Sequence, residues 1–195
     1  MRASRVGLAT VVAGLLAVAP AAAQEQPSHE EMMAAWADAM MVGPEHEALT
    51  ARAGTWTATT TYPVEPGSEE MQSEQGTVER TATLDGRVLE ERMDSSMMGQ
   101  PYAGIGRTGY DNVTDRYWTT WNDTMSTGLM VMYGDYDEAT STYTYEGTTT
   151  DPLMGEVPMR IEHTVEGPDR ETMLLFMEMP GQGMSEMMEV VYERQ

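Results

Sequence analysis

The sequence predicts a mainly β domain, an antiparallel meander that closes into a barrel of about ten strands after one N-terminal helix. Two observations predict this fold. From Thr55 onward, short runs rich in Thr, Val, Tyr and Met alternate with clusters of turn residues. No run in that region has the length and 3.6-residue period of a crossover helix. Because free sheet edges invite pairing with other chains, we expect the first and last strands to pair. A two-sheet sandwich is the alternative.

The N-terminal residues have the pattern of a secretory signal peptide. Arg2 and Arg5 precede an apolar run at 6–18, and three alanines follow the run at 21–23. The run is short for a membrane-spanning helix, which disfavours a retained anchor. We therefore expect residues 1–23 to be removed, no membrane span in the mature chain, and a location in the periplasm or outside the cell.

Residues 24–44 are predicted to form a polar leader and an amphipathic helix. Ser28 and Glu31 have the spacing of a capping box, with Ser28 as N-cap. One face then carries apolar side chains at helical spacing: Met33, Trp36, Ala37 and Met40. Gly43-Pro44 ends the helix. We expect this face to pack on the domain or to cover one end of it, and a free partner-binding helix is the less favoured alternative.

The remaining residues, 45–195, are assigned to the barrel domain, beginning with a short helical turn at 45–52. The expected strands are 55–62, 77–84, 87–95, 102–110, 117–122, 127–133, 142–149, 159–165, 173–178 and 187–194. On the first strand, Trp56, Ala58, Thr60 and Tyr62 share one face because side chains alternate along a strand.

Glycines give two further local expectations. Asp85-Gly86 predicts a two-residue hairpin loop. Gly104, Gly106 and Gly109 predict bulges or strong bends in one strand. These three also match the letters of a dinucleotide-binding loop, but they precede a strand rather than a helix, which excludes that function.

The composition excludes several classes of function. The net charge is −21, and signal cleavage would take it to −23 by removing Arg2 and Arg5. A field of this sign repels phosphate backbones, so we expect no nucleic acid partner. With no Cys there are no disulfides and no thiol chemistry, and the three histidines lack metal-ligand spacing. We predict no cofactor and no metal site, and the sequence leaves the oligomeric state open.

The chain contains 20 methionines, many of them clustered. The clusters are Met93/Met97/Met98, Met125/Met130/Met132 and Met173/Met177/Met179/Met184/Met187/Met188. The favoured interpretation is that Met replaces Leu and Phe in the core. An adaptable apolar pocket is the second interpretation, and a buffer for Cu(I) or oxidants is the third.

A pocket mouth is the leading site hypothesis, with aromatic walls and a few polar anchors. Its candidate ligand-binding residues are Trp56, Arg92, Tyr110, Trp121, Asp123, Met125 and Met132. A turn held by Asn and Asp side chains is the favoured alternative for the polar segment at 122–126. An enzyme is the other alternative, with Asp123 or Glu91 as acid or base and Arg92 or Tyr110 holding an anion.

Charged residues on the strand at 87–95 pose a similar choice. Glu90, Arg92 and Asp94 share one side of that strand, and Glu91 shares the other with Met93. A solvated face of alternating charge is favoured. An inward Glu paired with Arg is the alternative, because a charge inside a barrel needs a partner.

Two sets of motifs resemble known families. Gly54-Thr55-Trp56 resembles the Gly-x-Trp opening of lipocalins and other calycins, in which the Trp closes one barrel end. A longer ordered set resembles the bacterial domain-of-unknown-function family 1579: Gly43-Pro44-Glu45-His46, Ala53-Gly54-Thr55-Trp56, Leu84-Asp85-Gly86-Arg87, Met97-Met98-Gly99-Gln100-Pro101, Gly109-Tyr110-Asp111-Asn112, Met125-Ser126-Thr127-Gly128 and Asp151-Pro152. The resemblance implies a calycin-like β domain and supplies no activity. From the strand count, the Gly-x-Trp start and the aromatic and Met faces, we predict an exported barrel that binds a small lipophilic molecule.

Overall fold

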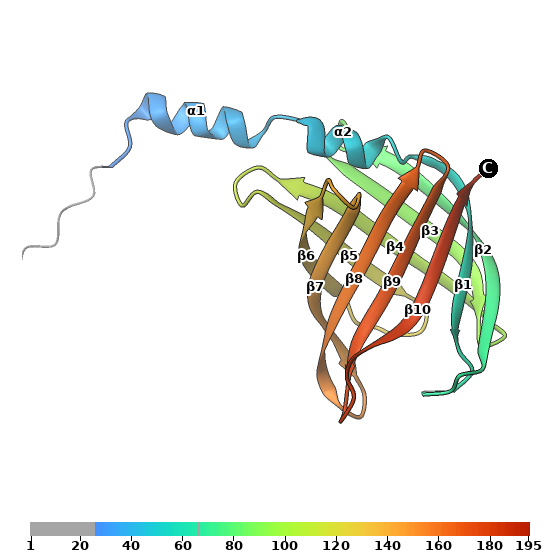
Figure 1. Ribbon diagram of the computed structural model, residues 1–195. Coiled ribbons are helices and arrows are strands. Elements are labelled where there is room, and N and C mark those ends of the chain that lie inside the picture. The colour runs from blue at the N-terminus through green and yellow to red at the C-terminus, as the bar shows by residue number, and fades with distance from the viewer. Residues whose placement is uncertain (1–25, 66) are drawn as a thin grey trace, which may run out of the picture.

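The computed structural model describes residues 26–65 and 67–195, so the signal peptide expected at 1–23 lies outside the described residues. Ten antiparallel strands close into one barrel (Figure 1). They are β1 (Gly54–Pro63), β2 (Met71–Thr83), β3 (Val88–Met97), β4 (Gln100–Asp111), β5 (Arg116–Asp123), β6 (Met130–Asp137), β7 (Thr142–Asp151), β8 (Gly155–Gly167), β9 (Arg170–Met179) and β10 (Gly183–Arg194). Each strand pairs with the next, and β1 pairs with β10. The predicted fold class is confirmed.

Two helices precede the barrel, α1 (His29–Ala39) and α2 (Pro44–Thr50). Helix α1 begins with the predicted capping box, since the Ser28 amide donates to Glu31 and the Glu31 amide donates to Ser28 Oγ. Helix α2 lies across one end of the barrel, where Leu49 is buried (Figure 1). We call this the α2 end and the opposite one the open end.

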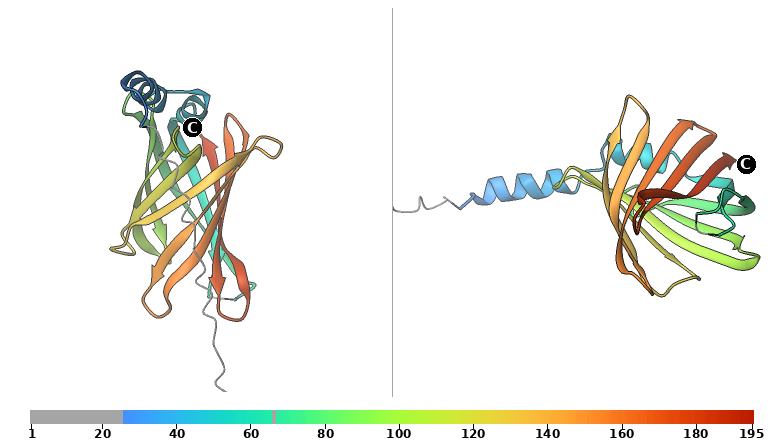
Figure 2. Two further views of the ribbon diagram at one scale, coloured as in Figure 1. Left: turned by 90° about the vertical axis from the view of Figure 1, so that its left-hand side faces the viewer. Right: turned by 60° about the horizontal axis from the view of Figure 1, so that its bottom comes forward.

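Helix α1 does not pack on the barrel, so that expectation is wrong. It extends away from the strands (Figure 2), none of its residues is buried, and Trp36 is 65 % exposed. Its last turn is tied to the barrel through carbonyl oxygens, because Asn112 Nδ2 donates to Asp38 and Ala39. Helix α2, which buries His46 and Leu49, covers that barrel end instead. In the described part of the chain, no helix is long and apolar enough to cross a membrane.

The interior holds two apolar clusters built from alternate strand residues. The Leu49 cluster consists of Leu49, Tyr117, Met132, Tyr143, Tyr145, Met159 and Ile161. The Trp56 cluster consists of Trp56, Ala58, Val78, Met93, Tyr102, Val190 and Tyr192. The predicted shared face of β1 is confirmed, and it faces inward, since Trp56, Ala58, Thr60 and Tyr62 are all buried. Met173 packs against both clusters and lies between them.

The glycines of β4 leave room for the indole rings of β5. They form no β-bulge, so that part of the expectation is wrong. The pairing of β4 with β5 is regular from Gly104 to Asp111. A Cβ on Gly104 would overlap Trp121 Cζ2, and one on Gly106 would lie 2.8 Å from Trp121 Cε3. On the opposite face, a Cβ on Gly109 would overlap the ring of Trp118. Missing side chains on β4 therefore give each tryptophan of β5 a flat surface to lie on.

The loop between β2 and β3 has four residues, so the two-residue hairpin is wrong. Thr83 pairs with Val88, and Leu84, Asp85 and Gly86 all have positive φ. The Arg87 side chain holds the wider loop, because its Nη1 donates to the Leu84 carbonyl and its Nη2 donates to the Met40 carbonyl. The extra residues thus link the loop to the end of α1.

Gly104→Ala should lower the free energy of unfolding by about 1–3 kcal/mol, the usual range for an added core methyl that displaces a side chain. The added Cβ would collide with Trp121. Urea denaturation measures the change. Gly167→Ala is the matched control, because no atom lies within 4 Å of the position that an added Cβ would take there. Equal stability of the two variants would contradict the packing role given to Gly104.

Candidate functional site

A cavity of about 120 Å³ lies inside the barrel, and we call it the central cavity. Its wall takes residues from both clusters, including Tyr145 of the first and Met93 and Tyr192 of the second. Five methionines border it, Met93, Met97, Met130, Met173 and Met188. Trp121, Leu175 and Val190 are among the other apolar residues that border it. The thioethers are flexible and fill irregular space well, so this wall can change shape around an occupant.

A buried ion cluster lies between the central cavity and α2. Its centre is Glu171 of β9, which is 1 % exposed. Arg52, just after α2, donates from Nε to Oε1 at 2.8 Å and from Nη2 to Oε2 at 2.7 Å. Arg80 of β2 donates from Nη1 to Oε2 at 2.7 Å. His163 Nε2 of β8 lies 2.8 Å from the same oxygen. One carboxylate on β9 therefore joins β8, β2 and the segment that follows α2.

Arg80 extends the cluster across the barrel. Its side chain is fully buried, and its Nε donates to Glu91 Oε2 at 2.6 Å. The guanidinium lies between two rings, with Cζ 4.8 Å from the centroid of Trp56 and 4.6 Å from that of Tyr192. Two arginines thus face two glutamates, which satisfies the requirement that buried charges be paired.

His163 is the uncharged member of the cluster. Burial lowers its pKa to about 4, and the positive charge of Arg52 acts in the same direction. A carboxylate only accepts hydrogen bonds, so Nε2 of the neutral ring carries the proton that Glu171 accepts. Nδ1 is then the acceptor left for Arg52 Nη2, which lies 3.4 Å from Nδ1 and 2.9 Å from Nε2. Burial alone would raise the pKa of Glu171, but the His163 hydrogen bond and the Arg52 charge hold it well below the usual range.

A second polar group lies at the open end of the barrel. Trp121 Nε1 is 3.0 Å from both the Tyr102 hydroxyl and Asp123 Oδ2. Asp123 Oδ1 accepts from the amides of Met125 and Ser126. These hydrogen bonds from backbone amides form a turn held by an Asp side chain, which is the interpretation favoured for the polar segment at 122–126.

Two of the seven predicted site residues, Trp56 and Met132, are fully buried, and Trp121 alone of the seven borders the central cavity. Trp56 is fully buried at the α2 end, where its Nε1 donates to the Arg52 carbonyl. Met132 is fully buried in the Leu49 cluster. That any of the seven binds a ligand stays a prediction.

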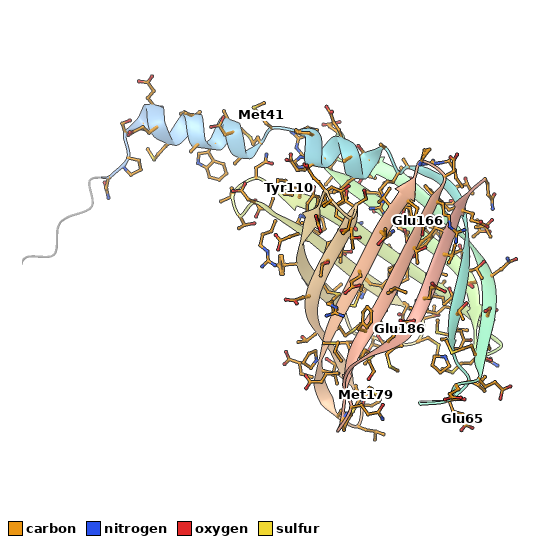
Figure 3. The ribbon with its side chains drawn as sticks, in the orientation of Figure 1. Met41, Glu65, Tyr110, Glu166, Met179 and Glu186 are labelled. Carbon is orange, nitrogen blue, oxygen red and sulfur yellow. The ribbon has the colours of Figure 1, made fainter. Side chains whose placement is uncertain are left out.

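The other four lie away from the cavity. Arg92 faces outward and pairs with Asp94 at 3.3 Å. Met125 is 54 % exposed in the loop after β5. Tyr110 lies at the α2 end (Figure 3), with its ring edge-on to His46 at 5.7 Å, whereas Asp123 ends β5 at the open end.

The proposed catalytic set does not converge, which is a correction. Tyr110 pairs with Tyr117, and Asp123 lies six positions further along β5, or roughly 20 Å at the usual rise per residue. Arg92 is on the outer face. Arg92 and Asp94 lie on an exposed face of alternating charge, as favoured, whereas Glu91 faces inward with Arg80, not Arg92, as its partner.

Sequence reasoning missed Arg52, Arg80, His163 and Glu171. One signal was present: His163 alternates with Met159 and Ile161, and Glu171 alternates with Met173 and Leu175. A titratable residue in register with an apolar strand face indicates a buried, partnered group. The predicted ninth strand began at 173, so Glu171 was assigned to no strand. Within residues 26–65 and 67–195, no group of three or more His, Cys, Asp or Glu side chains is placed to hold a metal ion.

A family model described as a protein of unknown function, DUF1579, matches residues 41–194. The chain belongs to this family. A search of curated proteins gives no match. The crystal structure of Rv2717c from M. tuberculosis is 17 % identical, covering 80 % of this chain and 99 % of that one with a TM-score of 0.58. At this identity the likeness shows the shared barrel fold alone.

A redesigned β-barrel, mFAP0, solved with bound DFHBI, is also 17 % identical. The match covers 74 % of the DUF1579 chain and 99 % of mFAP0, with a TM-score of 0.38. A likeness this distant carries no argument about the DUF1579 barrel.

The buried imidazole should make the protein less stable as pH falls. The unfolded chain binds a proton at His163 near the ordinary pKa of 6.5, whereas the folded chain resists protonation until about pH 4. Between pH 7 and pH 5.5 this should cost about 1 kcal/mol of unfolding free energy. Urea denaturation at the two pH values measures it.

His163→Gln keeps a donor for Glu171 and removes the titration, so it should abolish this loss. His29→Gln, on the exposed helix α1, should retain it. An equal loss in the His163 variant and the wild type would show that His163 does not cause the pH dependence.

Proposed function

We propose that this protein is exported and binds one small, largely apolar molecule in the central cavity. The observation that carries the proposal is the cavity itself, about 120 Å³ of space bordered by five methionines, Trp121 and Leu175. Small β-barrels are wide enough to hold one small ligand. An apolar protein cavity of roughly 150 Å³ binds benzene or xenon, so a one-ring molecule is close to the size of the present cavity and needs only a small adjustment of its wall.

Methionine explains how a larger occupant could be accepted. Met93, Met173 and Met188 have unbranched side chains with three rotatable bonds, which can repack without moving the strands. The copper-buffer alternative stays a prediction from the sequence. The methionines divide between the cavity wall, the core and exposed positions such as Met98 and Met125.

Toluene should bind in the cavity and shift the methyl resonances of Met93, Met173 and Met188 in protein labelled with ¹³C-methyl methionine. Met32 and Met33 on the exposed helix α1 are internal controls and should not shift. A saturable titration is expected. Unchanged spectra at toluene saturation, or equal shifts on α1, would overturn the binding proposal.

Two variants test whether toluene binds in the central cavity, one that fills the cavity and one that does not. Val190 borders the cavity and is 2 % exposed, whereas Val191 is the next residue on the same strand and faces outward. Val190→Phe should abolish toluene binding because the ring occupies the space, and Val191→Phe should retain it. Circular dichroism and the native methyl spectrum verify that both variants fold.

The proposal that the protein is exported is based on the signal-peptide pattern at residues 1–23. The mature chain should begin at Gln24 and be found in the periplasm or the medium when the protein is isolated from its source organism. Intact mass spectrometry of the fractionated cells measures both points. A chain that starts at Met1 in the cytoplasmic fraction would contradict export.

A further inference from the structure

The wall of the central cavity is divided by chemistry along the barrel axis. Met97 and Met130 lie toward the open end, at the last residue of β3 and the first of β6. Arg52, Glu91 and His163 form the wall toward the α2 end. An occupant therefore meets thioethers and Tyr102 toward the open end and members of the ion cluster toward the α2 end.

Hydroxyl groups without protein partners also border this cavity. Thr60 is 1 % exposed, and its Oγ1 is buried without a hydrogen bond among the described residues. Tyr145 and Tyr192 line the same cavity, each 4 % exposed, and within the described ranges neither hydroxyl has a hydrogen bond to another side chain or to the backbone, although only the Thr60 hydroxyl is both fully buried and unpaired. Leaving a buried hydroxyl unpaired is unfavourable, so a partner from outside the chain is expected at this wall.

The ion cluster specifies what charge that partner can carry. Arg52 and Arg80 are already bound to Glu171 and Glu91, and the imidazole of His163 is neutral. An ionised carboxylate in the cavity would find no unpaired positive charge on the described wall, and an ammonium would find no unpaired carboxylate there. Arg80 Nη2 has no partner among the described residues, but Arg80 lies between the rings of Trp56 and Tyr192, behind the cavity wall.

We propose that the central cavity selects an uncharged amphiphile. Its small apolar body would lie against Met93, Trp121 and Leu175. Its single hydroxyl or carbonyl group would hydrogen bond to the hydroxyls of Thr60 and of the two tyrosines. This inference rests on the proposed function, because it names the class of molecule that the same cavity binds.

Three single-ring molecules distinguish apolar, uncharged polar and charged ligands. Toluene has no polar group, phenol has an uncharged one, and benzoate is ionised at pH 7. Affinities come from methyl NMR titrations of the full mature chain. Phenol should bind at least as tightly as toluene, because the wall supplies partners that a purely apolar cavity lacks. Benzoate should bind at least tenfold more weakly than phenol, because a buried unpaired charge is costly.

Thr60→Val removes the hydroxyl and keeps the shape. It should weaken phenol binding three- to tenfold and leave toluene binding unchanged or tighter. Thr59→Val, on the outward face of β1, is the matched control and should change neither affinity. Tyr192→Phe, which also removes one hydroxyl from the wall, is the second variant and should weaken phenol binding alone.

The outcomes distinguish the two proposals. If toluene binds but phenol binds tenfold more weakly and is insensitive to Thr60→Val, the amphiphile inference is overturned and the apolar binding function stands. Ordered water would then be the partner of the hydroxyls. If benzoate binds as tightly as phenol, the neutral-ligand inference is likewise overturned. If no probe binds, both proposals fall together.

Discussion

The carboxylate of Glu171 is the constraint on which the α2 end of the barrel depends. It accepts hydrogen bonds from Arg52, Arg80 and His163, which come from three separate parts of the chain. Neither arginine could be buried without an acceptor, because an unpaired charge in the interior costs several kcal/mol. The helix α2 can cover the barrel only because Arg52, just beyond it, is neutralised inside.

The same cluster sets the chemistry of the central cavity. It places paired charges at one end of the space and leaves hydroxyls available beside them. At the other end, flat glycine surfaces on β4 let Trp121 lie close to the strand instead of filling the interior. The tryptophans of β5 thus pack against the glycines of β4, and methionines border the space that remains in the barrel.

Local sequence signals predicted the strands but not the contacts across the barrel. Alternating side chains and turn residues located all ten strands, and Ser28 with Glu31 located the start of α1. The direction of α1 could not be predicted, because its apolar face alone does not show what it meets. The glycines of β4 were expected to make bulges or strong bends, and their packing against Trp118 and Trp121 could not be predicted because these partners are identified only once the register of β5 is known.

The candidate site was predictable only in part, for a related reason. Trp121 was found from its strand and its aromatic type. Arg52 and Glu171 are 119 residues apart, and Arg80 and Glu171 are 91 apart, so no spacing motif joins them. Only closure of β1 on β10 determines which face of each strand is interior and brings these residues together.

The central claim is that the barrel encloses an apolar cavity that an outside molecule can fill. A crystal structure determined under xenon pressure tests it most directly, because xenon enters dry apolar cavities and reports their position. The account predicts a xenon atom inside the barrel, in contact with Met93, Trp121 and Leu175. An interior without xenon, closed by the methionine side chains or filled by ordered water, would contradict it.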